Sequence, residues 1–292
     1  MDITTAPDRL VLSLDGLTLA DYVYRPCQPQ LESPRPYARL TTRDGHPATA
    51  HRPGDHRWHQ GFSLALPNVG PDNFWGGPTY LRDRGYVQLP NNGAQVHRSF
   101  ETVRPGAVAV VVETLDWITE PGQRILAERR RLTARPLDPN AWALTWASHL
   151  TNLTGDPLSL GSPATQGRDD AGYGGLFWRG PEAFRGGAIT GPNGPTGEAA
   201  RGASGPWLAF TAPRDPVSVL LVDAQPSGPH PWFARSEEYA GLGPAPFFQA
   251  ETGLAPGASL RLAAVLVVGR PRPLTHLSQA TDLAAETARE PL

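Results

Sequence analysis

The spacing of glycine and proline constrains the fold of this chain more than any other feature. The sequence holds 31 glycines and 32 prolines in 292 residues, and they separate short apolar runs along most of its length. Both residues interrupt helices and are common in the turns between strands. Short strands at regular spacing, with turn residues between them, are typical of antiparallel sandwiches. The pattern therefore predicts an all-β chain.

The apolar runs define the strands that we expect. Residues 108–118 are almost continuously β-branched, and the alternating run 124–133 pairs with them most simply. Further strands are expected at 10–14, 17–24, 37–42, 86–89, 95–100, 141–150, 157–160, 207–210 and 217–222, with the turn 214–216 between the last two. Residues 225–246 would form a long loop, and 247–254 with 259–268 a closing hairpin. Helical spacing at 274–289 predicts one terminal helix.

Length and pattern together favour one domain covering residues 1–292. We find no internal repeat and no linker, and large β folds often reach this length as single domains. The fold that we predict is a large antiparallel β-supersandwich with one short C-terminal helix.

Composition removes several classes of function. The net charge of −2 gives no nucleic-acid footprint, and the lone Cys27 excludes intrachain disulfides and thiolate zinc sites. No run of 18 apolar residues is present to cross a membrane, and no basic, apolar leader opens the chain. We therefore expect a bacterial cytoplasmic protein, while its oligomeric state stays open.

The stretch 51–77 is the centre of the predicted site. It contains His51, His56 and His59 together with Trp58 and Trp75. Imidazole titrates near neutrality and serves as a general acid, a general base or a metal ligand. Aromatic faces beside hydrogen-bonding groups suit a pyranose ring. We expect His56 and His59 to be catalytic, and His51, Trp58, Asn73 and Trp75 to bind substrate.

Two alternatives for this stretch remain open. The three imidazoles of His51, His56 and His59 are candidate ligands for a divalent metal, which is the one cofactor that we consider. Their spacing does not match the zincin helix motif. Alternatively, the histidines satisfy loop carbonyls, and the tryptophans cover the edge of the core.

Other residues are weaker candidates. His97 is a possible further imidazole for catalysis, although a lone histidine in a strand is more often structural. Substrate-binding roles are also expected for Arg168, Asp169, Tyr173 and Arg179 in a glycine-rich region, and for Trp232 and Arg235 in a possible lid. The run 129–131, three consecutive arginines, is most simply a solvated strand edge.

Several motifs together resemble one family. They are H-R-P-G-D-H-R-W-H-Q-G, D-N-F-W-G, D-D-A-G-Y-G-G-L-F-W-R, H-P-W-F-A-R and L-A-P-G-A-S-L-R-L, which spread over about residues 37–269. They resemble the PmoA-like family of unknown function, often labelled methane oxygenase PmoA in bacterial genomes. The strand rhythm also resembles galactose-mutarotase-type supersandwiches, which bind sugars on a concave face. That resemblance implies a catalytic histidine and glutamate, and Glu251 lies near the expected place of the glutamate.

These observations support two hypotheses. In the first, the chain is a carbohydrate-active enzyme acting on a sugar or an oxidised (keto) sugar. His56 or His59 would transfer a proton, with His97 or Glu251 as counterpart, in an epimerase, mutarotase or lyase type of reaction. A metal is possible in this version. In the second, the chain is a non-catalytic carbohydrate-binding protein.

Overall fold

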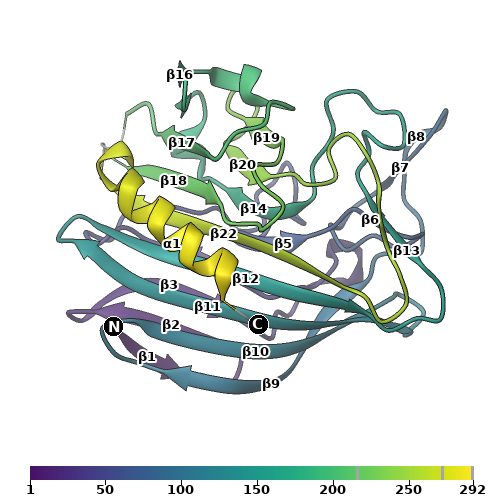
Figure 1. Cartoon of the computed structure of the whole chain (residues 1–292), viewed down its shortest axis with the longest axis horizontal. Helices are drawn as coiled ribbons and strands as arrows, with labels where there is room; N and C mark the ends of the chain where they lie inside the picture. Colours follow the sequence, from purple (N-terminus) through teal and green to yellow (C-terminus); the bar gives the residue numbers. More distant parts are fainter. Residues whose placement is uncertain (215–216, 271–272, 291–292) are drawn as a thin grey trace.

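The computed structural model describes residues 1–214, 217–270 and 273–290, and its main feature is a pair of large antiparallel sheets (Figure 1). The first sheet has eight strands in the order β1 (Asp2–Thr5), β2 (Arg9–Leu14), β3 (Leu17–Val23), β4 (Tyr37–Leu40), β5 (Phe62–Ala65), β14 (Gly175–Arg179), β20 (Gly241–Pro244) and β19 (Trp232–Arg235). The second has nine, in the order β16 (Gly194–Pro195), β15 (Ala188–Gly191), β17 (Trp207–Thr211), β18 (Ser218–Asp223), β22 (Ser259–Gly269), β12 (Ala141–Asn152), β11 (Arg124–Asp138), β10 (Ala109–Ile118) and β9 (Ala94–Arg104).

Smaller elements complete the described chain. A three-stranded sheet joins β21 (Thr252–Leu254), β13 (Leu158–Gly161) and β6 (Asn68–Val69), and a hairpin joins β7 (Thr79–Leu81) to β8 (Gly85–Val87). The 3-10 turns are η1 (Gln30–Glu32), η2 (Glu182–Phe184), η3 (Gly197–Ala200) and η4 (Pro273–His276), and the last of these leads into α1 (Leu277–Arg289).

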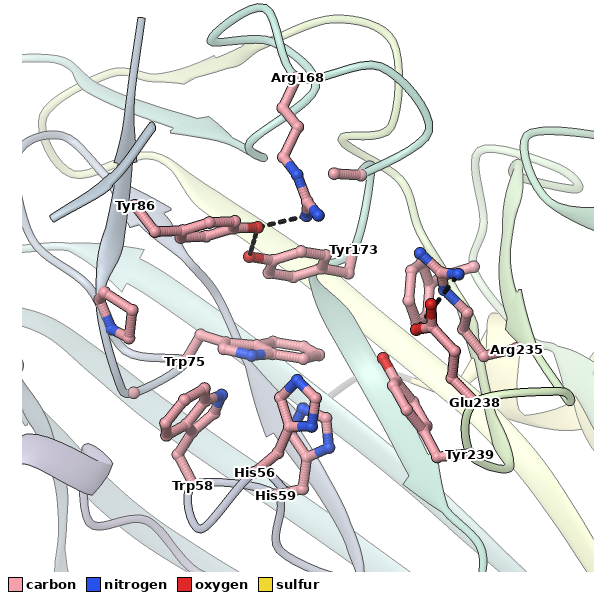
Figure 2. Close-up of a pocket in the computed structure, with 14 residues that line it drawn as sticks. His56, Trp58, His59, Trp75, Tyr86, Arg168, Tyr173, Arg235, Glu238 and Tyr239 are labelled. Carbon is pink, nitrogen blue, oxygen red and sulfur yellow. Dashed lines mark hydrogen bonds and ion pairs between the residues drawn. The ribbon is translucent and has the colours of Figure 1, made fainter. Parts of the chain in front are cut away.

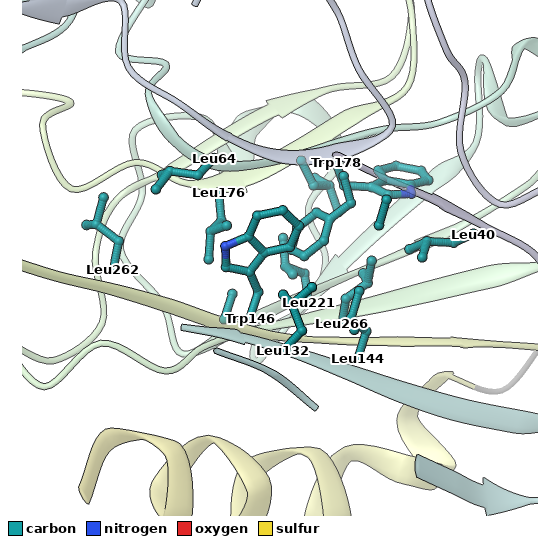
Figure 3. Packing of buried hydrophobic residues seen from close by; sticks show 14 of the residues in the cluster. Leu40, Leu64, Leu132, Leu144, Trp146, Leu176, Trp178, Leu221, Leu262 and Leu266 are labelled. Atoms are coloured by element: carbon teal, nitrogen blue, oxygen red, sulfur yellow. The ribbon is translucent and has the colours of Figure 1, made fainter. Parts of the chain in front are cut away.

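Alternating side chains build the core between the two sheets. In β12, Leu144 and Trp146 point inward, and from the opposite sheet Leu176 and Trp178 of β14 meet them in one continuous cluster (Figure 3). The Trp146 and Trp178 side chains are fully buried. Each indole also has a hydrogen-bond partner, since Trp146 donates to the Ser148 hydroxyl and Trp178 to the Ala48 carbonyl.

Helix α1 covers the outer face of the nine-stranded sheet, where it lies across β12 and β22 (Figure 1). Its buried residues Ala280, Leu283 and Ala284 pack against alanine and valine side chains of those strands. In the described part of the chain, no helix is long and apolar enough to cross a membrane.

The predicted fold class is confirmed. Both large sheets are antiparallel, and the terminal helix lies where helical spacing placed it. The pairing of β10 with β11 is also confirmed. The strands predicted at 207–210 and 217–222 pair as β17 and β18, whereas the turn 214–216 lies partly outside the described residues.

Two predictions near the C-terminus are wrong. The loop 225–246 contains two strands, β19 and β20, which pair with each other at the edge of the eight-stranded sheet. Gly243 is needed there because a Cβ atom would lie 2.5 Å from the Leu176 carbonyl oxygen. Since glycine is uncommon inside strands, the sequence pattern at this position does not indicate one. The closing hairpin is also absent: β21 pairs with β13, while β22 pairs with β12 and β18.

The arginine run 129–131 is only partly a solvated edge. Alternation along β11 turns Arg130 inward, where its side chain is 0% exposed and its guanidinium lies 4.6 Å from the Trp146 ring centroid. It donates to both carboxylate oxygens of Glu128 and to the Tyr22 hydroxyl on the opposite sheet. A buried polar network therefore links the two sheets beside the apolar core.

Candidate functional site

Two residues of β19, the edge strand of the eight-stranded sheet, help to line a cavity of about 290 Å³. Figure 2 shows its lining residues. Side chains from four segments line it, and most of them are aromatic or imidazole rings. They are His56, Trp58, His59, Trp75, Gly76, Pro78, Tyr86, Arg168, Ala171, Tyr173, Phe233, Arg235, Glu238 and Tyr239. The stretch 51–77 therefore supplies one wall, as the sequence predicts, and the other walls come from residues far along the chain.

Buried Arg35 fixes the wall that carries the two tryptophans. Its guanidinium donates to the carbonyl oxygens of Trp58 at 2.6 Å and Trp75 at 2.9 Å. Burial lowers the pKa of Arg35 to about 9, with Glu32 acting in the opposite direction, so the side chain stays cationic at neutral pH. Sequence inspection missed this residue, since it lies in a proline-rich loop without a recognisable motif.

Asn73 has a structural role in the same wall. Its side-chain oxygen accepts hydrogen bonds from the backbone amides of Trp75 at 2.8 Å and Gly76 at 2.9 Å. Its amide nitrogen donates to the Gly77 carbonyl and to the Thr79 hydroxyl. All of its polar atoms are thus occupied, and it holds Trp75 rather than facing the cavity.

The His56 and His59 rings stack against each other inside the cavity. Their centroids are 4.5 Å apart and their planes differ by 6°. Tyr239 lies beside both, at 5.2 Å from His56 and 5.5 Å from His59, and Trp75 meets His59 edge-on at 5.6 Å. Both imidazoles that we expected to be catalytic thus line the same cavity.

An ion pair behind the imidazoles gives them opposite tautomers. Arg179 donates from Nη2 to both oxygens of Asp55, at 3.0 and 2.8 Å, and from Nη1 to Nδ1 of His59 at 2.8 Å. Because a guanidinium only donates, Nδ1 of His59 accepts, and the proton of a neutral ring must be on Nε2. Asp55 lies 2.9 Å from Nδ1 of His56, so that nitrogen carries a proton and Nε2 of His56 is left as an acceptor.

Burial and nearby charge reinforce this assignment. Burial, followed by His56, Arg179 and Arg35, holds the pKa of His59 well below its usual range, so His59 is neutral at pH 7. Burial also raises the pKa of Tyr239 to about 12, which keeps its hydroxyl protonated. The Arg179 guanidinium lies 4.1 Å from the Tyr239 ring centroid, and Arg179 itself lies behind the cavity wall.

The opposite rim is built by Tyr86, Tyr173 and Arg168. The two tyrosine hydroxyls are 2.9 Å apart, and Arg168 donates to the Tyr86 hydroxyl (Figure 2). Tyr173 also packs on Trp75 with ring centroids 4.5 Å apart. Tyr86, on the β7–β8 hairpin, was not among the predicted site residues, and no motif distinguishes it in the sequence.

Several predicted residues lie away from this cavity. His97 packs against Tyr24 and Phe100 and bonds to Glu113 at 2.6 Å between the sheets. Glu251 accepts from the Ser159 hydroxyl at 2.5 Å and the Gln166 amide at 2.7 Å. Neither residue therefore reaches His56 or His59, and the geometry does not support them as acid–base counterparts.

Three proposed binding residues also take other positions. Trp232 is 1% exposed in the core, with its indole N–H donating to the Gly205 carbonyl at 2.7 Å. His51 stacks on Tyr37, with centroids 4.7 Å apart, outside the cavity lining. Asp169 is exposed on its loop and does not line the cavity. Of the predicted binding residues, Trp58, Trp75, Arg168, Tyr173 and Arg235 do line it.

The residues present do not fit a divalent cation. Across residues 1–214, 217–270 and 273–290, no three His, Cys, Asp or Glu side chains converge on one point. The Nδ1 atom of His59 already accepts from a cation, Arg179, and His51 stacks elsewhere. We therefore derive no chemistry through a metal at His51, His56 and His59.

The fold and the cavity together define a β-sandwich protein with an aromatic cavity that two imidazoles line. The model of the family of unknown function DUF6807 matches residues 9–276, so the chain belongs to that family. No curated protein is significantly similar to it. Among solved structures, the Slr1438 protein from Synechocystis sp. PCC 6803 is 13% identical, with a TM-score of 0.42, covering 92% of this chain and 99% of that one.

Proposed function

We propose that this protein is a carbohydrate-active enzyme that moves a proton on a sugar or an oxidised sugar. One observation carries the proposal: two stacked imidazoles line the same aromatic cavity, and their partners, Asp55 for His56 and Arg179 for His59, assign them opposite tautomers. A proton acceptor and a hydrogen-bond donor side by side are what acid–base chemistry at a carbonyl or anomeric centre requires. We propose with it that the chain is related to the PmoA-like and mutarotase-like proteins that its motifs resemble. We also propose that it acts in the bacterial cytoplasm.

The lining of the cavity supports a sugar-sized ligand. Trp58 and Trp75 offer aromatic faces, and the Tyr239 hydroxyl has no hydrogen-bond partner within the described residues. A pyranose has apolar C–H faces that stack on rings and hydroxyls that take such polar groups. The volume of about 290 Å³ suits a single ring rather than an extended chain.

The proton transfer follows from the tautomers. Nε2 of His56 removes a proton from a carbon beside the carbonyl, or from the anomeric hydroxyl, and Asp55 at Nδ1 stabilises the resulting imidazolium. The electron pair moves toward the substrate oxygen, which accepts a hydrogen bond from Nε2–H of His59. The Arg179 cation at Nδ1 of His59 favours that developing negative charge. Delivery of a proton to the opposite face of the same carbon completes an epimerisation. In a mutarotation the ring oxygen takes up a proton as its bond to the anomeric carbon breaks, and the ring closes again on the other face of the carbonyl. In an elimination the group on the next carbon leaves with its bonding electron pair.

Variants of the two histidines test this directly. Aldoses and uronic acids are incubated with the protein in D2O, and NMR follows deuterium uptake at carbon and exchange between anomers. His56→Gln and His59→Gln should each lower the rate by roughly 10²–10⁴-fold, the range for a lost general acid or base. Circular dichroism checks the fold of both variants, above all of His59→Gln, because the His59 ring is buried and packs on Trp75 and Phe177.

Trp58→Ala separates the enzyme from the alternative, a non-catalytic carbohydrate-binding protein. In an enzyme, loss of the stacking face weakens sugar binding and leaves the rate at saturation much less affected. If both histidine variants keep full turnover while Trp58→Ala abolishes binding, the acid–base role is wrong and the binding protein is the better account.

A further inference from the structure

The strongest unexplained feature of the cavity is the charge balance of its rim. Three charged side chains line the cavity: Arg168, Arg235 and Glu238. Arg235 has acidic neighbours, since its Nη1 atom lies 3.5 Å from Glu238 and 3.9 Å from Glu198. Arg168 forms no ion pair with any residue in the described ranges. Arg168 is therefore the one charged side chain of the lining that has no oppositely charged partner within ion-pair distance in the described ranges.

Arg168 is held in place without using up its hydrogen-bonding capacity. Its Nη1 atom donates to the Tyr86 hydroxyl, and its guanidinium carbon lies 4.7 Å from the Tyr86 ring centroid. Tyr86 is in turn bonded to Tyr173, which packs on Trp75. A guanidinium has five N–H donors in a planar fork, so most of them stay available. Such a preorganised cation is suited to a planar anion.

A second arginine adds to the charge at this rim. The Arg82 guanidinium packs against the backbone of Gly167, where a Cβ atom would lie 3.1 Å from Nη1. Arg82 is exposed on the β7–β8 hairpin and likewise makes no ion pair within the part of the chain that the structure describes. Arg168 and Arg82 therefore place two guanidiniums on this side of the cavity that have no carboxylate within ion-pair distance in the described residues, whereas Arg235 has two.

We infer that the ligand of this cavity is a carboxylate-bearing sugar, and that Arg168 binds its carboxylate. This inference rests on the proposed function and narrows its substrate to sugar acids. A carboxylate matches the planar fork of one guanidinium, and Arg168 is the lining arginine that has no carboxylate partner in the described residues. Arg82 lies outside the lining, so a phosphate dianion inside the cavity would contact Arg168 alone.

Matched neutral and acidic probes test the inference. Galacturonate, its neutral amide, galactose and galactose 6-phosphate are titrated into the full-length protein by calorimetry. Galacturonate should bind roughly 10- to 100-fold more tightly than galacturonamide, as expected for a charge-assisted hydrogen-bonded pair. Arg168→Gln should bring the two affinities together, and Arg168→Lys should retain part of the preference. Arg235→Gln is the matched control, and it should reduce the preference much less.

Other results overturn the inference in distinguishable ways. Equal binding of acid and amide, or a preference that survives in Arg168→Gln, removes the carboxylate site but leaves the proposed sugar enzyme standing. If galactose 6-phosphate binds more tightly than galacturonate, the natural ligand is better described as a phosphate ester than as a carboxylate. A non-sugar pair, 4-hydroxybenzoate and its amide, completes the test. If 4-hydroxybenzoate is the only probe that binds, and Arg168→Gln abolishes that binding, the carboxylate site at Arg168 is supported and the proposal of a sugar ligand is wrong. If none of the probes binds, both the carboxylate site and the sugar ligand are contradicted.

Discussion

At the scale of single residues, the site depends on polar groups whose partners lie far away in the sequence. His56 and His59 are close in the chain, and their rings stack in the lining of one cavity. The tautomer of His59, however, is set by Arg179, which lies 120 positions further along the chain, and the same arginine holds Asp55, the partner of His56. Sequence inspection placed Arg179 on the cavity surface, whereas it lies behind the imidazoles and acts as a positioning residue. No spacing rule predicts such a contact, because strand pairing between β5 and β14 creates it.

A residue that proved structural gives a prediction about pH. Burial, followed by Arg39 and Arg52, lowers the pKa of His51 to about 4. An unfolded histidine titrates near 6.5, so unfolding takes up a proton at His51 between pH 6.5 and about 4. Stability is complete above this window and falls as the pH decreases through it. His51→Gln should reduce the proton uptake on unfolding by up to about one proton.

Urea denaturation at several values between pH 4.5 and 7.5 measures this effect. The stability of the variant should depend less steeply on pH than that of the wild type. Identical slopes would show that the His51 imidazole has the same pKa in the folded and unfolded chain.

At the scale of elements, the glycine pair at the end of the stretch 51–77 fixes the tryptophan wall. Gly76 and Gly77 have φ values of +101° and +68°, and both contact Trp58. A Cβ atom on Gly77 would lie 2.8 Å from the indole ring. The sequence shows two glycines after a tryptophan, but not which ring packs on them.

Gly77→Ala should therefore displace Trp58 and destabilise the protein. The left-handed backbone conformation costs about 1–2 kcal/mol for alanine, and the clash adds roughly 1–3 kcal/mol. Gly257→Ala is the control, because Gly257 has a φ of +72° and nothing within 4 Å of the added carbon. Chemical denaturation and tryptophan fluorescence report the two effects. Equal losses in the free energy of unfolding in both variants, with no change in fluorescence, would contradict this prediction. They would show that the Trp58 indole accommodates the added carbon without an energetic penalty.

The strands themselves were the most predictable elements. β-branched and alternating runs identified β10, β11, β12 and β22, because burial on one or both faces imposes that pattern. Sequence pattern did not predict β19 and β20, because close packing there requires glycine. It also predicted the wrong pairing partner for β21. Strand pairing depends on the whole arrangement of the sheets, and local residues carry little information about it.

At the scale of the whole molecule, the two sheets are joined by an apolar core and by the buried Arg130 network. Removing one partner from a buried ion pair leaves the other charge without compensation. Arg130→Met should therefore cost about 3–5 kcal/mol of stability. Its neighbour in the strand provides the control: Arg129 pairs with Glu101 at the surface, and Arg129→Met should change stability by less than about 1 kcal/mol. Denaturation midpoints compare the two, and similar small losses would contradict a linking role for Arg130.

The central claim for the whole molecule is that the fold brings Arg179 and Asp55 together so that two neighbouring imidazoles have opposite tautomers. Nitrogen-15 NMR of histidine-labelled protein near pH 8 measures this directly, with His56→Gln and His59→Gln assigning the signals. We predict a proton on Nδ1 of His56 and on Nε2 of His59, and a change in the His59 pattern in Arg179→Met. The same tautomer on both rings, or two protonated rings at that pH, would contradict the account.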